Sequence, residues 1–279
     1  MKELRVYILG VPFDYGIQLI NGRPGARFGP KKIKEALCAL IKNQKNLPSI
    51  HYENITPVKK NVQKTHERVT ASVVKILKAG EVPIVIGGGH DISFGSVQAL
   101  AIFYKKIGQI NIDAHYDVRP VEGGKITSGT PFRRLLDGGF LSGKNFVELG
   151  IHSPKNLEEH RNYLVKKKAT LIKLDYINRI GLEKSCDKAL SIASKNTHAV
   201  AFDIDIDGVQ KRFAPGCSAP GIQGFTKKQI CTLAYRAGKN KHVQLFNLME
   251  VSPVYDRKNK TVRLAAELIV CFMRGMNER

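Results

Sequence analysis

Several features are scarce or missing in this 279-residue sequence, and each absence excludes a class of protein. The five cysteines are an odd number, lie far apart and form no C-x-x-C pair, so a disulfide framework and a zinc knuckle are both disfavoured. No apolar run approaches the roughly 20 residues that cross a bilayer. The apolar N-terminal stretch is cut short by Asp14 and lacks a cleavage site. We therefore expect a soluble, cytoplasmic protein with reduced thiols and no membrane partner.

Acidic residues are also few: 24 stand against 45 lysines and arginines, for a formal charge of +21. Such a charge raises the question of nucleic acid, a membrane surface or an anionic substrate. The basic residues are scattered, and the densest run is only residues 166–168. We interpret them as a solvated lysine-rich surface and expect no nucleic-acid partner, while a non-enzymatic basic protein that binds nucleic acid is kept as an alternative. Neither G-x-G-x-x-G nor a Walker lysine pattern is present, which disfavours nucleotide binding.

The sequence does contain many short, continuously apolar runs, which is typical of strands covered on both faces. These runs are residues 5–11, 82–88, 109–113, 146–151, 170–175, 199–206 and 243–251. Amphipathic segments lie between them, such as residues 62–79, which Gly80 follows at the position of a helix C-cap. No linker, low-complexity tract or repeat interrupts the chain. The pattern predicts one domain over residues 1–279, a three-layer α/β/α sandwich with a mostly parallel sheet of about eight strands.

Unusual polar groups follow four of the expected strands, at the sheet edge where α/β proteins bind ligands. They occur in "VIGGGHD", "NIDAHYD", "AFDIDID" and "NLMEV", and comprise His90, Asp113, His115, Asp117, Asp203, Asp205, Asp207 and Glu250. A spacing of two residues places alternate side chains on one face of an extended chain. Buried carboxylates without cations would cost several kcal/mol per ion, so we predict a metal site. Two imidazoles and four carboxylates suit Mn2+ or another hard divalent ion, and six ligands suit two ions about 3.5 Å apart.

These motifs resemble those of the ureohydrolases, the family of arginase, agmatinase and formimidoylglutamase. The resemblance covers nearly the whole chain, from "GVPFDYGIQLINGRPGARFGP" through "GGGHD", "DAHYD", "SGTPF" and "FDIDI" to "MEVSP". It implies an arginase-like fold and two Mn2+ ions per chain. One ion would be held by His90, Asp113, Asp117 and Asp203, and the other by His115, Asp113, Asp203 and Asp205, with Asp113 and Asp203 bridging. Asp207 matches no ligand of the family, so we expect it to face solvent or cap a loop.

Within the family, the segment "SGTPF" is similar to formimidoylglutamases, because Ser128 stands where arginases and agmatinases have a histidine. The segments "DVRP", "NGRPGA", "GIHSPKN" and "APGCSAPGIQG" point the same way. The departures are Asp91, where glutamate is usual, and His152, where glutamine is common. The resemblance implies hydrolysis of N-formimidoyl-L-glutamate to formamide and L-glutamate in histidine degradation, by a homo-oligomer such as a trimer or hexamer. An agmatinase or another guanidino or amidino hydrolase that releases urea is the alternative.

The same resemblance leads to expected roles in catalysis and substrate binding. Glu250 would pair with the amidinium nitrogens, and Asp117 would carry a proton to the departing nitrogen. Arg119, whose planar fork can grip a carboxylate, is the first choice for binding the substrate's carboxylates. Further substrate contacts are expected from Arg23, Ser128, Thr130 and Asn156, although turns and helix starts also use such groups structurally. Arg133 and Arg134 are expected on the surface.

Overall fold

The computed structural model describes residues 5–42, 44 and 47–279. Its strands are β1 (Arg5–Gly10), β2 (Ser49–Asn54), β3 (Val82–Ile86), β4 (Ile107–Ile112), β5 (Phe146–Ile151), β6 (Thr170–Lys173), β7 (Ala199–Asp205) and β8 (Val243–Met249). Its helices are α1 (Tyr15–Leu19), α2 (Gly29–Ile41), α3 (Val62–Lys78), α4 (Ile92–Tyr104), α5 (Pro131–Asp137), α6 (Glu158–Lys166), α7 (Leu174–Ile180), α8 (Leu182–Ser194), α9 (Lys227–Lys239) and α10 (Lys260–Met276).

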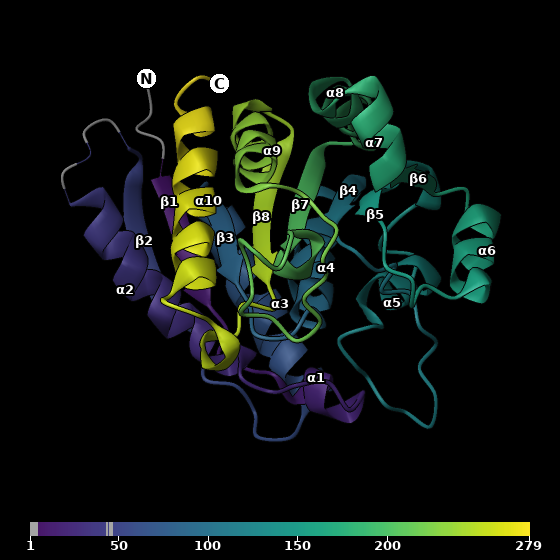
Figure 1. Cartoon of the computed structure of the whole chain (residues 1–279), viewed down its shortest axis with the longest axis horizontal. Coiled ribbons are helices and arrows are strands. Elements are labelled where there is room, and N and C mark those ends of the chain that lie inside the picture. Colours follow the sequence, from purple (N-terminus) through teal and green to yellow (C-terminus); the bar gives the residue numbers. More distant parts are fainter. Residues whose placement is uncertain (1–4, 43, 45–46) are drawn as a thin grey trace.

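The eight strands form one sheet in the order β2-β1-β3-β8-β7-β4-β5-β6, and every pair between neighbouring strands is parallel. Helices cover both faces of the sheet (Figure 1). One apolar core packs the sheet against α2, α7, α8, α9 and α10, and a second packs it against α3, α4, α5 and α6. The expected three-layer α/β/α sandwich with a parallel sheet is confirmed.

The central strands form where the sequence is continuously apolar, because helices cover them on both sides. β3 and β5 are buried at every position. The expected helix over residues 62–79 is confirmed as α3, which Asn61 caps by accepting a hydrogen bond from the backbone nitrogen of Lys64 at 2.9 Å. The edge strand β2 was not expected, since its sequence, "SIHYEN", is polar and mostly exposed.

The strand order positions the candidate site. The four strands followed by polar motifs, β3, β8, β7 and β4, are consecutive neighbours at the centre of the sheet (Figure 1). Because these strands are parallel, their C-terminal ends lie at one edge, and the loops that follow them meet there. None of the helices in the described part of the chain combines the length and the apolar character that a bilayer crossing requires.

Candidate metal centre and active site

A first group of potential metal ligands surrounds His90, in the loop after β3. Its Nδ1 atom lies 2.9 Å from Asp117 Oδ2 and 3.2 Å from both Asp113 Oδ2 and Asp205 Oδ2. One ligand atom from each of the four residues lies within 4.8 Å of all the others. A single nitrogen surrounded by three carboxylate oxygens is an arrangement that a divalent cation would stabilise.

A second group, formed by Asp113, His115 and Asp207, adjoins the first. His115 Nδ1 lies 3.1 Å from Asp207 Oδ2 and 3.4 Å from Asp113 Oδ1. Asp113 thus belongs to both groups: its Oδ2 faces His90 and its Oδ1 faces His115. This is the position that a carboxylate shared between two ions would occupy.

The donor set fits a pair of hard divalent ions. The side chains supply imidazole nitrogens and carboxylate oxygens without a thiolate, which suits Mn2+ or a similar ion. Both ring nitrogens of His90 are buried and have no hydrogen-bond partner in the described part of the chain. Its contacts with the three carboxylates are close but lack hydrogen-bond geometry, so the imidazole is left available to a metal ion.

The pKa values of His90 and His115 are both raised by the carboxylates around them. Burial by itself lowers the pKa of His90, but Asp113, Asp117 and Asp205 outweigh it and raise the pKa well above its usual value. Burial opposes protonation of His115 too, yet Asp207 and Asp113 raise its pKa to about 12. The carboxylates therefore favour positive charge at the two imidazoles, and a bound divalent ion would supply such charge in place of protons.

The structure places two aspartates of the "DIDID" segment differently from what we expected. Asp203, expected to bridge the metals, lies outside both groups of potential ligands: it is still within β7, and its carboxylate accepts hydrogen bonds from Ser93 Oγ and Gln109 Nε2, both at 3.1 Å. Asp207, expected to face solvent or cap a loop, is instead buried beside His115. The reason is that β7 extends to Asp205, so the strand's end and the turn after it reach the centre, where Asp207 N donates to Asp205 Oδ1 at 2.8 Å.

Glu250 and Asp117 both have left-handed backbone conformations, with φ of +65° and +45°. For residues other than glycine this costs about 1–3 kcal/mol, so the surrounding structure must hold them in place. Glu250 N donates to Gly88 O at 2.9 Å, and Phe132 N donates to Asp117 O at 3.3 Å. Glu250 Oε1 accepts a hydrogen bond from His90 N at 2.9 Å, whereas its buried Oε2 has no partner in the described residues. Burial and Asp205 raise the pKa of Glu250 well above its usual value.

A cavity of about 740 Å³ opens beside His115. Its lining residues are Arg23, Ala114, His115, His152, Ser153, Pro154, Lys155, Ser218, Ala219, Pro220, Gly221, Ile222 and Gln223. The guanidinium of Arg23 donates to the carbonyls of Ser218 at 2.9 Å and Cys217 at 2.7 Å, which directs this cation along the cavity wall. Lys155, which the sequence analysis missed, adds a second cation. Lys155 could have been found from its position in the loop after β5, because that loop lies at the edge of the sheet where ligands bind.

The other expected substrate contacts lie outside this lining. Arg119 is exposed and packs its aliphatic stem near Gly129. Thr130 Oγ1 donates to Thr127 O at 2.8 Å within a turn, and Asn156 Nδ2 donates to Ala114 O at 2.9 Å, which anchors the loop after β5 to the loop after β4. Ser128, half-buried, donates its backbone N–H to Gly16 O at 3.2 Å. Turn and loop geometry therefore accounts for the observed contacts of Thr130 and Asn156.

Arg134 also departs from expectation, because it is half-buried rather than on the surface. Its Nη1 donates to His66 Nδ1 at 2.9 Å, and its guanidinium lies 3.5 Å from the centre of the Phe94 ring. His66 Nε2 in turn lies 3.0 Å from Asp91 Oδ2, next to His90 in the chain. We call His66, Asp91 and Arg134 the histidine brace, since they connect α3, α5 and the turn that carries His90.

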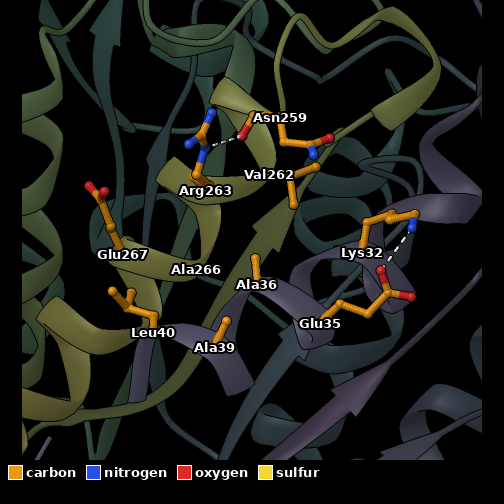
Figure 2. Close-up of a pocket in the computed structure, with 10 residues that line it drawn as sticks. All are labelled: Lys32, Glu35, Ala36, Ala39, Leu40, Asn259, Val262, Arg263, Ala266 and Glu267. Atoms are coloured by element: carbon orange, nitrogen blue, oxygen red, sulfur yellow. Dashed lines mark hydrogen bonds and ion pairs between the residues drawn. The ribbon is translucent and has the colours of Figure 1, made fainter. Parts of the chain in front are cut away.

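A second hollow, of about 510 Å³, lies between α2 and α10 (Figure 2). Small apolar side chains such as Ala36 and Ala266 line it, as do Lys32 and Glu35, which form an ion pair at 2.8 Å. It contains no member of the two groups of potential metal ligands.

Comparison with known proteins agrees with this geometry. A family model for the arginase family matches residues 4–275. The chain is 30% identical to a formimidoylglutamase from Halalkalibacterium halodurans over 260 residues, which covers 90% of this chain and 82% of that protein. Among solved structures, Trypanosoma cruzi formiminoglutamase with Mn2+2 has a TM-score of 0.91 at 26% identity, covering 100% of this chain and 95% of that one. The formimidoylglutamase of Bacillus subtilis also has a TM-score of 0.91, at 26% identity, covering 98% and 87%. The chain therefore belongs to the arginase family.

Proposed function

We propose that this protein is a formimidoylglutamase that uses two Mn2+ ions to hydrolyse N-formimidoyl-L-glutamate to formamide and L-glutamate. The observation that carries the proposal is the pair of ligand groups sharing Asp113, placed beside a cavity lined by cations. Membership of the arginase family and the similarity to formimidoylglutamases support it.

His90, Asp113, Asp117 and Asp205 would hold one ion, and Asp113, His115 and Asp207 the other. When bound, two such ions lower the pKa of water, so that a nucleophile is available at neutral pH. The protein's part is to hold the ligand side chains in place around the two positions. This differs from the assignment that the resemblance implied: Asp203 is left out, Asp205 moves to the ion beside His90, and Asp207 joins the ion beside His115. We assign them so because Asp205 and Asp207 are the carboxylates that face the imidazoles.

Glu250 binds the amidinium of the substrate in this proposal. Its Oε1 accepts a hydrogen bond from His90 N, while its Oε2 has no partner among the described residues and can accept a charge-assisted hydrogen bond. The formimidoyl carbon is thereby held next to the ions. Asp117 is 15% exposed, against 6% or less for the other carboxylates of the two ligand groups. It is therefore the acid best placed to deliver a proton to the glutamate nitrogen as the C–N bond breaks.

The two substrate carboxylates would be bound by Arg23 and Lys155, which line the cavity. We rank Arg119, Ser128, Thr130 and Asn156 below them, because these residues lie outside its lining. Ser128 cannot titrate near neutral pH, so no proton transfer is assigned to it. Among the described residues, the cavity lining includes no Asp or Glu that could pair with the ammonium group of agmatine, which disfavours the agmatinase alternative.

The test is a substrate panel with the purified, Mn2+-loaded protein: formimidoylglutamate, agmatine, arginine and 4-guanidinobutyrate. We expect formamide from the first and little urea from the others. The matched control is Lys195→Gln, a change at the opposite edge of the sheet, which should leave all rates unchanged. Urea release faster than formamide release would overturn the proposed substrate.

A further inference from the structure

A row of buried polar side chains crosses the sheet directly beneath the candidate metal centre. Asn247 on β8 pairs with Asp203 on β7, Asp203 pairs with Asn111 on β4, and Asn111 pairs with Glu148 on β5. All four side chains are fully buried. We call them the buried polar row; the four strands that carry it lie side by side in Figure 1.

This row is costly for the fold. A buried polar group that lacks a hydrogen bond costs about 1–3 kcal/mol in proteins. Asn111 Oδ1, Glu148 Oε1 and both amide atoms of Asn247 have no partner in the described part of the chain. Within that same part, Glu148 has no ion pair with a cation. The core on this face is otherwise largely apolar, so hydrophobic packing alone would not require polar groups here.

The row is tied to the metal centre through Asn111. Asp113 lies two residues beyond Asn111, and alternate residues of an extended chain share a face. Asn111 Nδ2 donates to Glu148 Oε2 at 2.9 Å and lies 3.4 Å from Asp113 Oδ2. An amide nitrogen carries two hydrogens, so one can bind Glu148 while the other points at Asp113. Asp113 is the carboxylate that both ligand groups share.

We propose that Asn111 and Glu148 are a positioning pair that orients the shared carboxylate of Asp113 for two metal ions. Glu148 fixes the rotation of the Asn111 amide, and the amide holds Asp113 Oδ2 toward His90, which leaves Oδ1 directed at His115. This inference rests on the metal-binding part of the proposed function and is independent of the substrate. Glu148 acts as a hydrogen-bond acceptor and needs no charge. In agreement, burial and Asp113 raise the pKa of Glu148 well above its usual value.

The test is calorimetric titration of the metal-free protein with MnCl2, compared with the urea unfolding of each variant. Partners that orient metal ligands typically contribute 10–100-fold in metal affinity. We therefore expect Asn111→Leu and Glu148→Leu to weaken Mn2+ binding about 10–100-fold. Glu148→Gln, whose carbonyl oxygen can still accept from Asn111, should stay within about 3-fold of the wild type on the same scale.

Asn247→Leu is the matched control, because it removes an amide from the same row without touching a ligand. It should leave Mn2+ affinity unchanged, whatever it does to urea unfolding. Equal weakening in Asn111→Leu and Asn247→Leu would overturn the proposal, as would a Glu148→Gln variant as weak as Glu148→Leu. If Asn111→Leu does not fold, Asn111→Ala takes its place with the same expected result. A wild type that binds Mn2+ but does not cleave formimidoylglutamate would refute the proposed substrate and leave this inference standing.

Discussion

Three aspartates occupy every second position of the "DIDID" segment, and each has different hydrogen-bond and ion-pair partners. Asp203 accepts hydrogen bonds from two neutral donors, Ser93 on α4 and Gln109 on β4. Asp205 and Asp207 instead face the imidazoles of His90 and His115. The presence of a metal site could be predicted from the residue types and their spacing. Which two of the three carboxylates reach it could not, because that depends on where β7 ends.

The first prediction concerns this choice. Asp207→Asn should reduce bound Mn2+ from two equivalents per chain to about one after dialysis, because a neutral amide is a poor ligand for a hard cation. Asp203→Asn should retain two. Metal content by atomic absorption measures both. Loss of an ion in Asp203→Asn, with two ions kept in Asp207→Asn, would instead favour Asp203 as the ligand.

A second prediction concerns Glu250. Glu250→Gln keeps an oxygen that can accept from His90 N but loses the carboxylate that we propose binds the amidinium. Hydrogen bonds to charged groups contribute about 1.5–3 kcal/mol, so kcat/KM for formimidoylglutamate should fall by about 10–100-fold. Mn2+ affinity should remain unchanged. A variant with normal kcat/KM would contradict the assigned role.

Among the structural elements, the histidine brace connects helices that the sequence analysis left unrelated. Arginine can only donate hydrogen bonds, so His66 Nδ1 must accept from Arg134, and His66 Nε2–H then donates to Asp91. This pattern requires a neutral imidazole. In agreement with it, burial lowers the pKa of His66 below its ordinary value of 6.5.

The brace predicts a pH dependence of stability. In the unfolded chain His66 gains its proton near pH 6.5, while in the folded protein it does so at a lower pH. The unfolded state therefore binds more protons as the pH falls below 6.5, and stability falls by up to about 1.4 kcal/mol per pH unit from this group. Urea unfolding of the metal-free wild type and of His66→Gln, between pH 5 and 8, should show a shallower dependence below pH 6.5 in the variant.

The exposed His242→Gln is the control for this measurement, and it should follow the wild type. An identical slope below pH 6.5 in wild type and His66→Gln would show that His66 contributes nothing to the pH dependence.

Secondary structure could largely be predicted where apolar runs are long, as for β3, β5 and α3. Two elements show what local pattern cannot supply. β2 forms from a polar sequence, "SIHYEN", because β1 offers it a full set of backbone partners. β4 ends at Ile112, so Asp113, His115 and Asp117 all follow the strand, and Asp117 is turned inward by its left-handed backbone.

At the scale of the whole molecule, the order of the strands assembles the centre. Sequence rules predict that polar motifs gather at the C-terminal edge of a parallel sheet. They do not determine that β3, β8, β7 and β4 are neighbours, since β3 pairs with β8 and β4 with β7, which are segments far apart in the sequence. The buried polar row has the same origin: its four members are adjacent only after β4, β5, β7 and β8 pair in register.

The formal charge of +21 is also a property of the whole molecule, and part of it lies near the cavity. Beside the cavity near His115 lies a further hollow with four cations on its wall, Lys211, Arg212, Arg257 and Lys260. Formimidoylglutamate has one positive and two negative groups, so its net charge is negative. The cations of this adjoining hollow should attract it. Salt should weaken that attraction, because the Debye length falls from roughly 30 Å at 0.01 M to roughly 8 Å at 0.15 M.

To separate this attraction from the effect of total charge, two lysines are replaced by glutamine either near the cavity or at a distant site. Lys211→Gln/Lys260→Gln, the entrance variant, removes two exposed charges from this hollow, and Lys195→Gln/Lys241→Gln, the distal variant, removes two exposed charges just before β7 and β8, at the opposite edge of the sheet. The entrance variant should have a severalfold higher KM at low salt and a smaller rise in KM as NaCl increases, because exposed charges act mainly within a Debye length. The distal variant should follow the wild type at every salt concentration. Equal behaviour of the two variants would mean that the basic surface serves the protein generally and plays no part in attracting substrate.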